Sequence, residues 1–193
     1  MVKLTGYKKV KTAVFISGNG SNLKSLIKFS KTNQSPISID LIVSNNPKAK
    51  GLGFGKIFKI RKKILNFEKR NQSENKLLTT LKLYDIKIIF LAGFMKILSK
   101  NFITKFRGKI LNIHPSLLPK YKGLNTHQRA LDNKEKHSGC TVHFVNSRLD
   151  SGKIVLQKKV KISRNETKHS LAAKVLAQEH KLYPRAILKI FNL

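Results

Sequence analysis

Short apolar segments recur along the chain, and their spacing restricts the fold more than any other feature of the sequence. Five of them have the length and β-branched content of buried strands: Val10–Ser17, Ile37–Val43, Ile57–Ile60, Ile86–Leu91 and Ile110–Ile113. Stretches with helical spacing lie between them, at Asn22–Lys31, Lys48–Phe54, Gln72–Leu83 and Ser99–Phe106. Alternating strands and helices predict an α/β fold with a mostly parallel, doubly wound sheet.

The C-terminal part of the sequence has a different pattern. Thr141–Val145 and Lys153–Ile162 are predicted strands joined by a turn at Asp150-Ser151-Gly152, and Glu166–Ile190 is a predicted long helix that contains Pro184. The chain has 193 residues, which suits one domain with a sizeable core. Because no low-complexity linker divides the sequence, we expect a single domain over residues 1–193.

The charge balance is extreme, with 40 Lys and Arg against 9 Asp and Glu and a net charge of +31. Nucleic acid, anionic small molecules and a genome-wide compositional bias are all compatible with such a balance. The basic residues are spread over the whole chain, which favours the bias. The sequence has no tryptophan and only four tyrosines on which bases could stack. We therefore expect small-molecule partners and no nucleic acid.

Several absences bear on location and cofactors. The single cysteine, Cys140, excludes an internal disulfide and a cysteine metal cluster. The six histidines show no metal-ligand spacing, so no metal site is expected. No apolar run is long enough to span a membrane, and the basic residues 1–11 lack the apolar centre of a secretory signal. These features predict a cytoplasmic protein.

A glycine-rich turn, Gly18–Asn22, follows the first predicted strand and leads into the first predicted helix. Glycines let the backbone approach a ligand, and a helix N-terminus presents free N–H groups and a partial positive charge. The turn therefore predicts phosphate binding at Gly20, Ser21 and Asn22. The alternative is an ordinary tight turn in which Ser21 or Asn22 caps the helix. A dinucleotide is disfavoured because Leu23 stands where its fingerprint needs a third glycine.

Asn112 and His114 form the most informative pair in the sequence. Residues i and i+2 of a strand point to the same face, so both side chains face one space, and Pro115 ends the strand after them. An amide that can donate to a developing oxyanion beside a titratable imidazole is suited to catalysis. The alternative is a strand end with a buried, hydrogen-bonded Asn and His.

Asp150 is the acidic residue that could complete this pair. A carboxylate beside His114 would favour the imidazolium and raise the pKa of His114. The two residues are far apart in sequence, but functional groups gather at the carboxyl ends of parallel strands. A plain turn aspartate before Ser151-Gly152 is the alternative.

Four motifs, in this order and spacing, resemble the phosphoribosylglycinamide formyltransferase family: Ile16–Leu23, Leu91–Met95, Leu111–Tyr121 and Leu149–Gly152. The resemblance covers nearly the whole chain. It implies a Rossmann-like formyltransferase fold, a mostly parallel twisted sheet with helices on both faces, forming a single catalytic domain over residues 1–193. It also implies an enzyme of purine biosynthesis that transfers the formyl group of 10-formyltetrahydrofolate to the amine of 5-phosphoribosylglycinamide, with no metal.

The resemblance further implies roles for individual residues. The catalytic trio of the family is matched by Asn112, His114 and Asp150. The ribonucleotide site is matched by Gly20, Ser21 and Asn22 at the phosphate, and by Glu179 at the glycinamide side. The folate site is matched by Arg70 at the glutamate end, by Met95, Lys96, Ile97 and Leu98 at the pterin, and by Asn112.

The sequence departs from the family pattern at Lys96, Asn125, Ser147 and Arg148, none of which belongs to the trio. Methionyl-tRNA formyltransferase shares the Asn-x-His-Pro site, and formyltetrahydrofolate hydrolase is a second sister enzyme. Each normally carries a further domain for which 193 residues leave no room. We therefore expect the purine enzyme.

Overall fold

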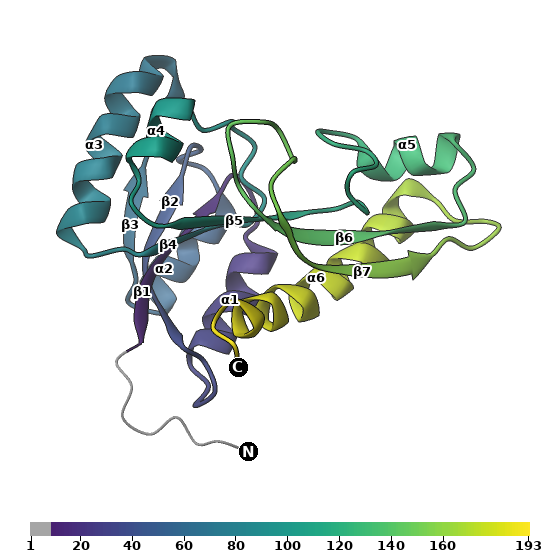
Figure 1. Ribbon diagram of the computed structural model, residues 1–193, viewed down its shortest axis with the longest axis horizontal. Helices are drawn as coiled ribbons and strands as arrows, with labels where there is room; N and C mark the ends of the chain where they lie inside the picture. Colours follow the sequence, from purple (N-terminus) through teal and green to yellow (C-terminus); the bar gives the residue numbers. More distant parts are fainter. Residues whose placement is uncertain (1–8) are drawn as a thin grey trace. The chain divides into compact units, whose positions relative to one another are not determined.

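The computed structural model describes residues 9–193, and its internal contacts divide the chain into two compact units (Figure 1). Unit 1 is residues 1–111 and unit 2 is residues 112–193. The strands follow the order β3-β2-β1-β4-β5-β6-β7 in a seven-stranded sheet. Strand β5 (Lys109–His114) begins in unit 1 and ends in unit 2. The expectation for residues 1–11 falls largely outside the described residues.

Unit 1 is built on parallel strands. Strand β1 (Val10–Ile16) pairs in parallel with β2 (Ile37–Ser44) and with β4 (Ile88–Leu91), and β2 pairs in parallel with β3 (Arg61–Ile64). Apart from Val10 at the start of β1, the apolar residues of β1, β2 and β4 are buried, as expected for strands covered on both faces. The predicted parallel sheet is confirmed in this unit.

The helical segments of unit 1 are α1 (Ser21–Ser30), η1 (Lys50–Leu52), α2 (Gly53–Ile57), η2 (Phe67–Lys69), α3 (Arg70–Leu83) and α4 (Lys100–Lys105). Figure 1 shows α1 and α3 on opposite faces of the strands. The chain steps outward from β1 to β2 through α1, and it returns from β3 past β1 to β4 through α3. Because such crossovers are right-handed, the reversal of direction moves the helices to the other face.

The third strand differs from its prediction. Residue Ile57 ends α2, and the strand is β3, at Arg61–Ile64 rather than Ile57–Ile60. Strand β3 stands at the end of the strand order, and Arg61 and Lys62 are exposed. An edge strand of this kind needs no apolar run, and charged side chains discourage further pairing. The apolar pattern therefore marked the wrong residues.

Unit 2 combines an antiparallel strand pair with a long helix. Strand β6 (His137–Phe144) pairs antiparallel with β7 (Ile154–Lys161), and α6 (Lys168–Ile190) packs against both. The side chain of Thr167 caps α6 by accepting a hydrogen bond from the backbone N–H of Ser170. Both predicted strands and the long helix are confirmed to within a few residues. A seven-residue helix, α5 (Thr126–Asp132), was not predicted.

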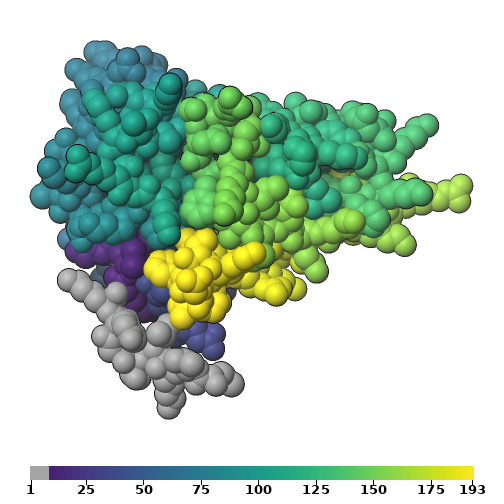
Figure 2. Space-filling view, in the orientation of Figure 1, coloured from purple at the N-terminus to yellow at the C-terminus, as the bar shows by residue number. Residues whose placement is uncertain are grey.

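The surface of unit 2 includes the end of the chain. The C-terminal residues, yellow in Figure 2, form part of the visible surface, and the side chain of Leu193 is exposed. Within the part of the chain that the structure describes, no helix is both long and apolar enough to cross a membrane.

Candidate active site

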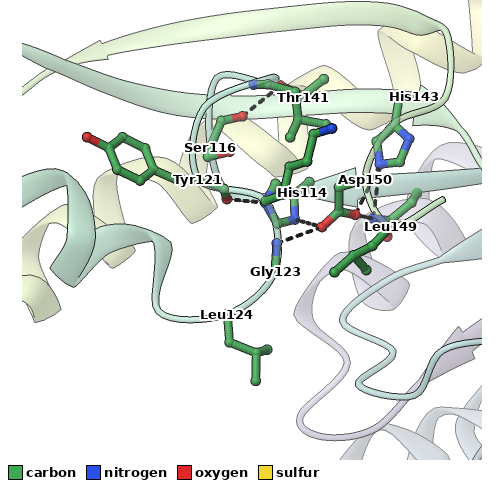
Figure 3. Close-up of polar contacts among 12 residues, drawn as sticks. His114, Ser116, Tyr121, Gly123, Leu124, Thr141, His143, Leu149 and Asp150 are labelled. Atoms are coloured by element: carbon green, nitrogen blue, oxygen red, sulfur yellow. Dashed lines mark hydrogen bonds and ion pairs between the residues drawn. The ribbon is translucent and has the colours of Figure 1, made fainter.

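The three residues of the predicted trio meet in unit 2. Figure 3 shows His114 beside Asp150. Asn112 and His114 lie at the C-terminal end of strand β5, and Asp150 lies in the connection between β6 and β7. The Nδ1 atom of His114 is 3.4 Å from Oδ2 of Asp150, and Nδ2 of Asn112 donates to Oδ1 of Asp150 at 3.3 Å. The alternative of a plain turn aspartate is therefore wrong.

Both ring nitrogens of His114 face oxygen atoms. Nε2 lies 2.9 Å from the backbone oxygen of Tyr121, which can only accept, and Nδ1 faces Asp150. Burial lowers the pKa of His114, and this effect exceeds the opposite effects of the Tyr121 carbonyl and the Asp150 charge. Asp150 therefore raises the pKa of His114 as predicted, but desolvation outweighs the carboxylate and makes the net shift downward.

Asp150 is held as an anion. Its Oδ2 accepts a hydrogen bond from the backbone N–H of Gly123 at 2.9 Å. Burial by itself raises the pKa of Asp150, but the contacts with His143, the Gly123 N–H and His114 together bring it below its ordinary value. The backbone of Asp150 is left-handed, with φ of 44°, a conformation that Asp adopts more readily than most residues. Asp150 is therefore ionised at neutral pH.

Side chains of β6 and β7 fix the loop that supplies the Tyr121 carbonyl and the Gly123 N–H. Thr141 donates to the backbone oxygen of Ser116 at 2.6 Å and accepts from the backbone N–H of Leu118 (Figure 3). Gln157 donates to the backbone oxygen of Leu118 at 2.8 Å. The loop backbone is thereby tied to the strands beside the trio.

His143 of β6 also belongs to this cluster, although no sequence motif pointed to it. Its Nε2 lies 3.2 Å from Nδ2 of Asn112 and 3.6 Å from Oδ1 of Asp150, and only 2% of its side chain is exposed. No role was predicted for His143 from the sequence. Its place in an apolar strand, two residues after the buried Thr141, was the available signal that it faces the protein interior.

The predicted phosphate loop lies in unit 1 and is shaped by backbone contacts. Gly20, with φ of 72°, is the residue that caps α1, so the expectation that Ser21 or Asn22 caps it is wrong. A Cβ atom on Gly20 would lie 2.9 Å from Cα of Gly51, and the N–H of Gly51 donates to the oxygen of Gly18 at 3.0 Å. Two backbone segments therefore touch where side chains would separate them.

The residues predicted to bind folate in unit 1 are linked through Glu74. The buried carboxylate of Glu74 accepts from Nε of Arg70 at 3.3 Å and from the backbone N–H of Ser99 at 2.9 Å, and the hydroxyl of Ser99 donates to it as well. The hydroxyl of Ser99 in turn accepts from the N–H of Phe102 and so caps α4. Arg70 and Ser99, the residue that follows Met95–Leu98, therefore donate to the same carboxylate, that of Glu74.

Within Met95–Leu98, the side chains of Met95 and Ile97 are 66% and 64% exposed, whereas Leu98 is buried. The backbone N–H of Met95 donates to the hydroxyl of Ser17 at 2.7 Å. That hydroxyl donates to Oδ1 of Asn45 at 2.5 Å. Polar contacts hold the backbone of this segment while two apolar side chains and Lys96 remain accessible.

Glu179 lies on α6 in unit 2 and is buried. Burial, reinforced by the charge of Glu179, raises the pKa of the Cys140 thiol to about 12. The thiol is therefore protonated at neutral pH and is a poor nucleophile. Over residues 9–193, no three His, Cys, Asp or Glu side chains are grouped so that they could hold a metal ion.

Comparison with known proteins identifies the class. Residues 10–187 match the model of the formyl transferase family, and the chain belongs to this family. It is 41% identical over 177 residues to phosphoribosylglycinamide formyltransferase of Escherichia coli K12, which covers 90% of this chain and 84% of the relative. It is also 41% identical over 183 residues to the human trifunctional purine biosynthetic protein adenosine-3. That match covers 93% of this chain but only 18% of the human protein.

Solved structures show the same fold. The phosphoribosylglycinamide formyltransferase of Brucella melitensis matches with a TM-score of 0.89 and 41% identity over 95% of this chain and 96% of that chain. The enzyme of the same name from Bacillus halodurans matches with a TM-score of 0.89 and 32% identity over 93% and 94%. The predicted Rossmann-like formyltransferase fold is confirmed.

Proposed function

We propose that this protein transfers the formyl group of 10-formyltetrahydrofolate to the amine of 5-phosphoribosylglycinamide, a step of purine biosynthesis. The meeting of Asn112, His114 and Asp150 carries the proposal, because it joins an amide, an imidazole and an ionised carboxylate within hydrogen-bonding range. The names of the E. coli and B. melitensis relatives support the same activity.

The chemistry of the unit 1 residues fits a folate. Its ring system is largely apolar and its tail carries carboxylates. Met95 and Ile97 present exposed apolar side chains, and Arg70 keeps part of its guanidinium exposed while Nε is held by Glu74. An arginine fork suits a carboxylate. Asn112, Lys96 and Leu98 complete the proposed folate site, and the bound folate would supply the formyl group and the leaving nitrogen.

We assign the ribonucleotide to the residues predicted for it. The N-terminus of α1 after Gly20, with Ser21 and Asn22, would hold the phosphate through backbone N–H groups and the helix dipole. Glu179 would meet the glycinamide side. Both substrates are anionic, which agrees with a chain whose net charge is +31.

In the proposed reaction the amine nitrogen bonds to the formyl carbon, and the bond from that carbon to the folate nitrogen breaks. The lowered pKa makes His114 a base in the resting site. Its Nδ1 takes up the proton that the amine loses, and the Asp150 carboxylate 3.4 Å away stabilises the imidazolium. His114 then returns a proton to the departing nitrogen. The amide of Asn112 is the predicted donor to the developing oxyanion, and a well-placed donor of this kind lowers the barrier by about 3 kcal/mol.

We further propose that residues 1–193 act as a single formyltransferase catalytic domain. The continuous family match over residues 10–187, which includes parts of both compact units, supports this. The cytoplasmic location stays a prediction.

A formyl-transfer assay tests the proposal. Purified protein is mixed with 5-phosphoribosylglycinamide and 10-formyltetrahydrofolate, the folate product is followed by absorbance, and a parallel reaction omits the ribonucleotide. We expect turnover that needs both substrates and disappears in His114→Ala. Turnover without the ribonucleotide would identify a hydrolase instead, and a folded protein without turnover in either reaction would refute the proposal.

A further inference from the structure

The buried histidine His143 touches two members of the trio and has no role in the proposed reaction so far. It reaches them from β6, whereas Asn112 and His114 lie on β5 and Asp150 lies beyond β6. Its Nε2 faces Nδ2 of Asn112 at 3.2 Å and Oδ1 of Asp150 at 3.6 Å. A buried imidazole in this place constrains both neighbours.

The backbone determines which nitrogen of His143 carries the proton. Nδ1 lies 2.8 Å from the backbone oxygen of Phe144, and a carbonyl oxygen can only accept, so Nδ1 is the donor. The neutral ring then has a lone pair on Nε2. That lone pair accepts one N–H of the Asn112 amide.

The Asn112 amide has one orientation that satisfies both of its neighbours. An ionised carboxylate only accepts, so the atom that faces Oδ1 of Asp150 at 3.3 Å must be Nδ2. The two hydrogens of Nδ2 are then directed at His143 and Asp150. Both amide hydrogens are thus engaged in the resting site, so the predicted donation to the oxyanion requires one of the two contacts to open.

We propose that His143 is a positioning residue that fixes the orientation of the Asn112 amide beside Asp150, so that the trio keeps one geometry. This inference rests on the proposed function for the reaction that the trio carries out. It assigns His143 no direct contact with a substrate. Its effect on the reaction passes through Asn112 and Asp150.

Three variants separate positioning from packing. His143→Phe keeps the ring volume and removes both polar contacts. His143→Gln places an amide group near the former Nε2, whereas His143→Asn places one near the former Nδ1 and leaves Asn112 without its acceptor. Ser138→Ala, a buried change on the same strand, serves as the control.

We expect His143→Phe to lower kcat roughly 100-fold, the scale associated with misplaced reacting groups, while both KM values stay close to wild type. His143→Gln should recover most of the lost turnover, His143→Asn should not, and Ser138→Ala should match wild type. An unchanged kcat in His143→Phe would overturn the proposal. Equal losses in Gln and Asn variants that also lose thermal stability would overturn it too, since they would indicate a packing role alone.

A spectroscopic readout keeps this test separate from the formyl-transfer assay. The side-chain amide resonances of Asn112 in the wild-type protein should shift in His143→Phe and return toward their original positions in His143→Gln. Unchanged resonances would refute the positioning role even if the enzyme is active. If the resonances shift but the wild-type protein shows no transfer activity, the contact between His143 and Asn112 is supported and the proposed function is refuted.

Discussion

Two sites of this molecule are built from different parts of the chain. In unit 1 the proposed phosphate loop is shaped by main-chain contacts, with Gly20 close to Gly51. In unit 2 the trio is shaped by side chains, with Asp150 receiving contacts from His114, Asn112 and the loop. A backbone site tolerates changes of side chain until a Cβ atom enters the contact. A side-chain cluster depends on each member and on its state of protonation.

The largest expected effect comes from removing the imidazole of the side-chain site. His114→Ala should lower kcat by about 10²- to 10⁴-fold, because the proposed proton carrier is lost. The melting temperature should stay close to wild type. The exposed His137 on β6 provides the control, since His137→Ala should leave kcat unchanged. Near-normal turnover of His114→Ala would show that the cluster is structural.

A single methyl group should disturb the backbone site. Gly20→Ala places a Cβ atom 2.9 Å from Gly51 in a left-handed conformation, which costs about 1–3 kcal/mol. We expect a lower denaturation midpoint and a higher KM for the ribonucleotide, with kcat much less affected. Gly18→Ala is the matched control, because a Cβ atom there meets nothing within 4 Å. Equal behaviour of the two variants would contradict the close backbone approach.

Acidification should destabilise unit 2 at a higher pH than unit 1. All six histidines of the sequence lie in unit 2. Burial is the main cause that lowers the pKa of His114, His127 and His180.

The sign of the acid effect follows from these shifts. Below their ordinary pKa of 6.5, the unfolded chain binds protons that the native chain does not. Stability is therefore full above pH 6.5 and declines as the pH falls toward the lowered native pKa values. Each unit of pKa difference corresponds to about 1.4 kcal/mol. Asp150 adds a later loss, since its native pKa lies below its ordinary 3.8 and its contribution disappears as the pH falls through the native value.

Hydrogen exchange between pH 7 and 5 measures this difference. Amides of unit 2 should lose protection, corrected for the intrinsic exchange rate, before those of unit 1. His127→Gln should flatten the decline in unit 2. Uniform loss of protection in both units would show that they respond to acid as one.

The smallest effect should come from salt. If the positive surface attracts the two anionic substrates, kcat/KM falls a few-fold as the ionic strength rises from low to physiological values and beyond. Turnover at saturating substrate should change little. A flat response of kcat/KM would assign the net charge to composition alone.

The sequence predicted the central strands well because their burial on both faces demands apolar runs, as in β1 and β4. It misplaced β3 because pairing of that edge strand depends on the backbone of β2 and not on apolar side chains. It missed α5, whose seven residues bury only Thr126 and Ala130, too little to produce a periodic pattern.

For the candidate site, the i and i+2 spacing placed Asn112 and His114 on one face without any further information. Strand topology allowed Asp150 to approach this pair, but only the family resemblance specified it, since no local rule links residues 38 positions apart. The role of His143 and the lowered pKa of His114 depend on burial and on neighbours from another strand. Tertiary packing determines both of these properties, and they cannot be predicted from patterns in a single sequence.

The left-handed backbone at Asp150 limits what a protein engineer can do at that position. Most amino acids placed there would bring a conformational penalty of about 1–2 kcal/mol in addition to any loss of charge, so an alanine or serine library would confound two effects. Asn tolerates the same φ, which makes Asp150→Asn the informative exchange. An engineer who wants to vary the proton affinity of His114 should therefore substitute residues of the neighbouring strand β6 and leave Asp150 in place.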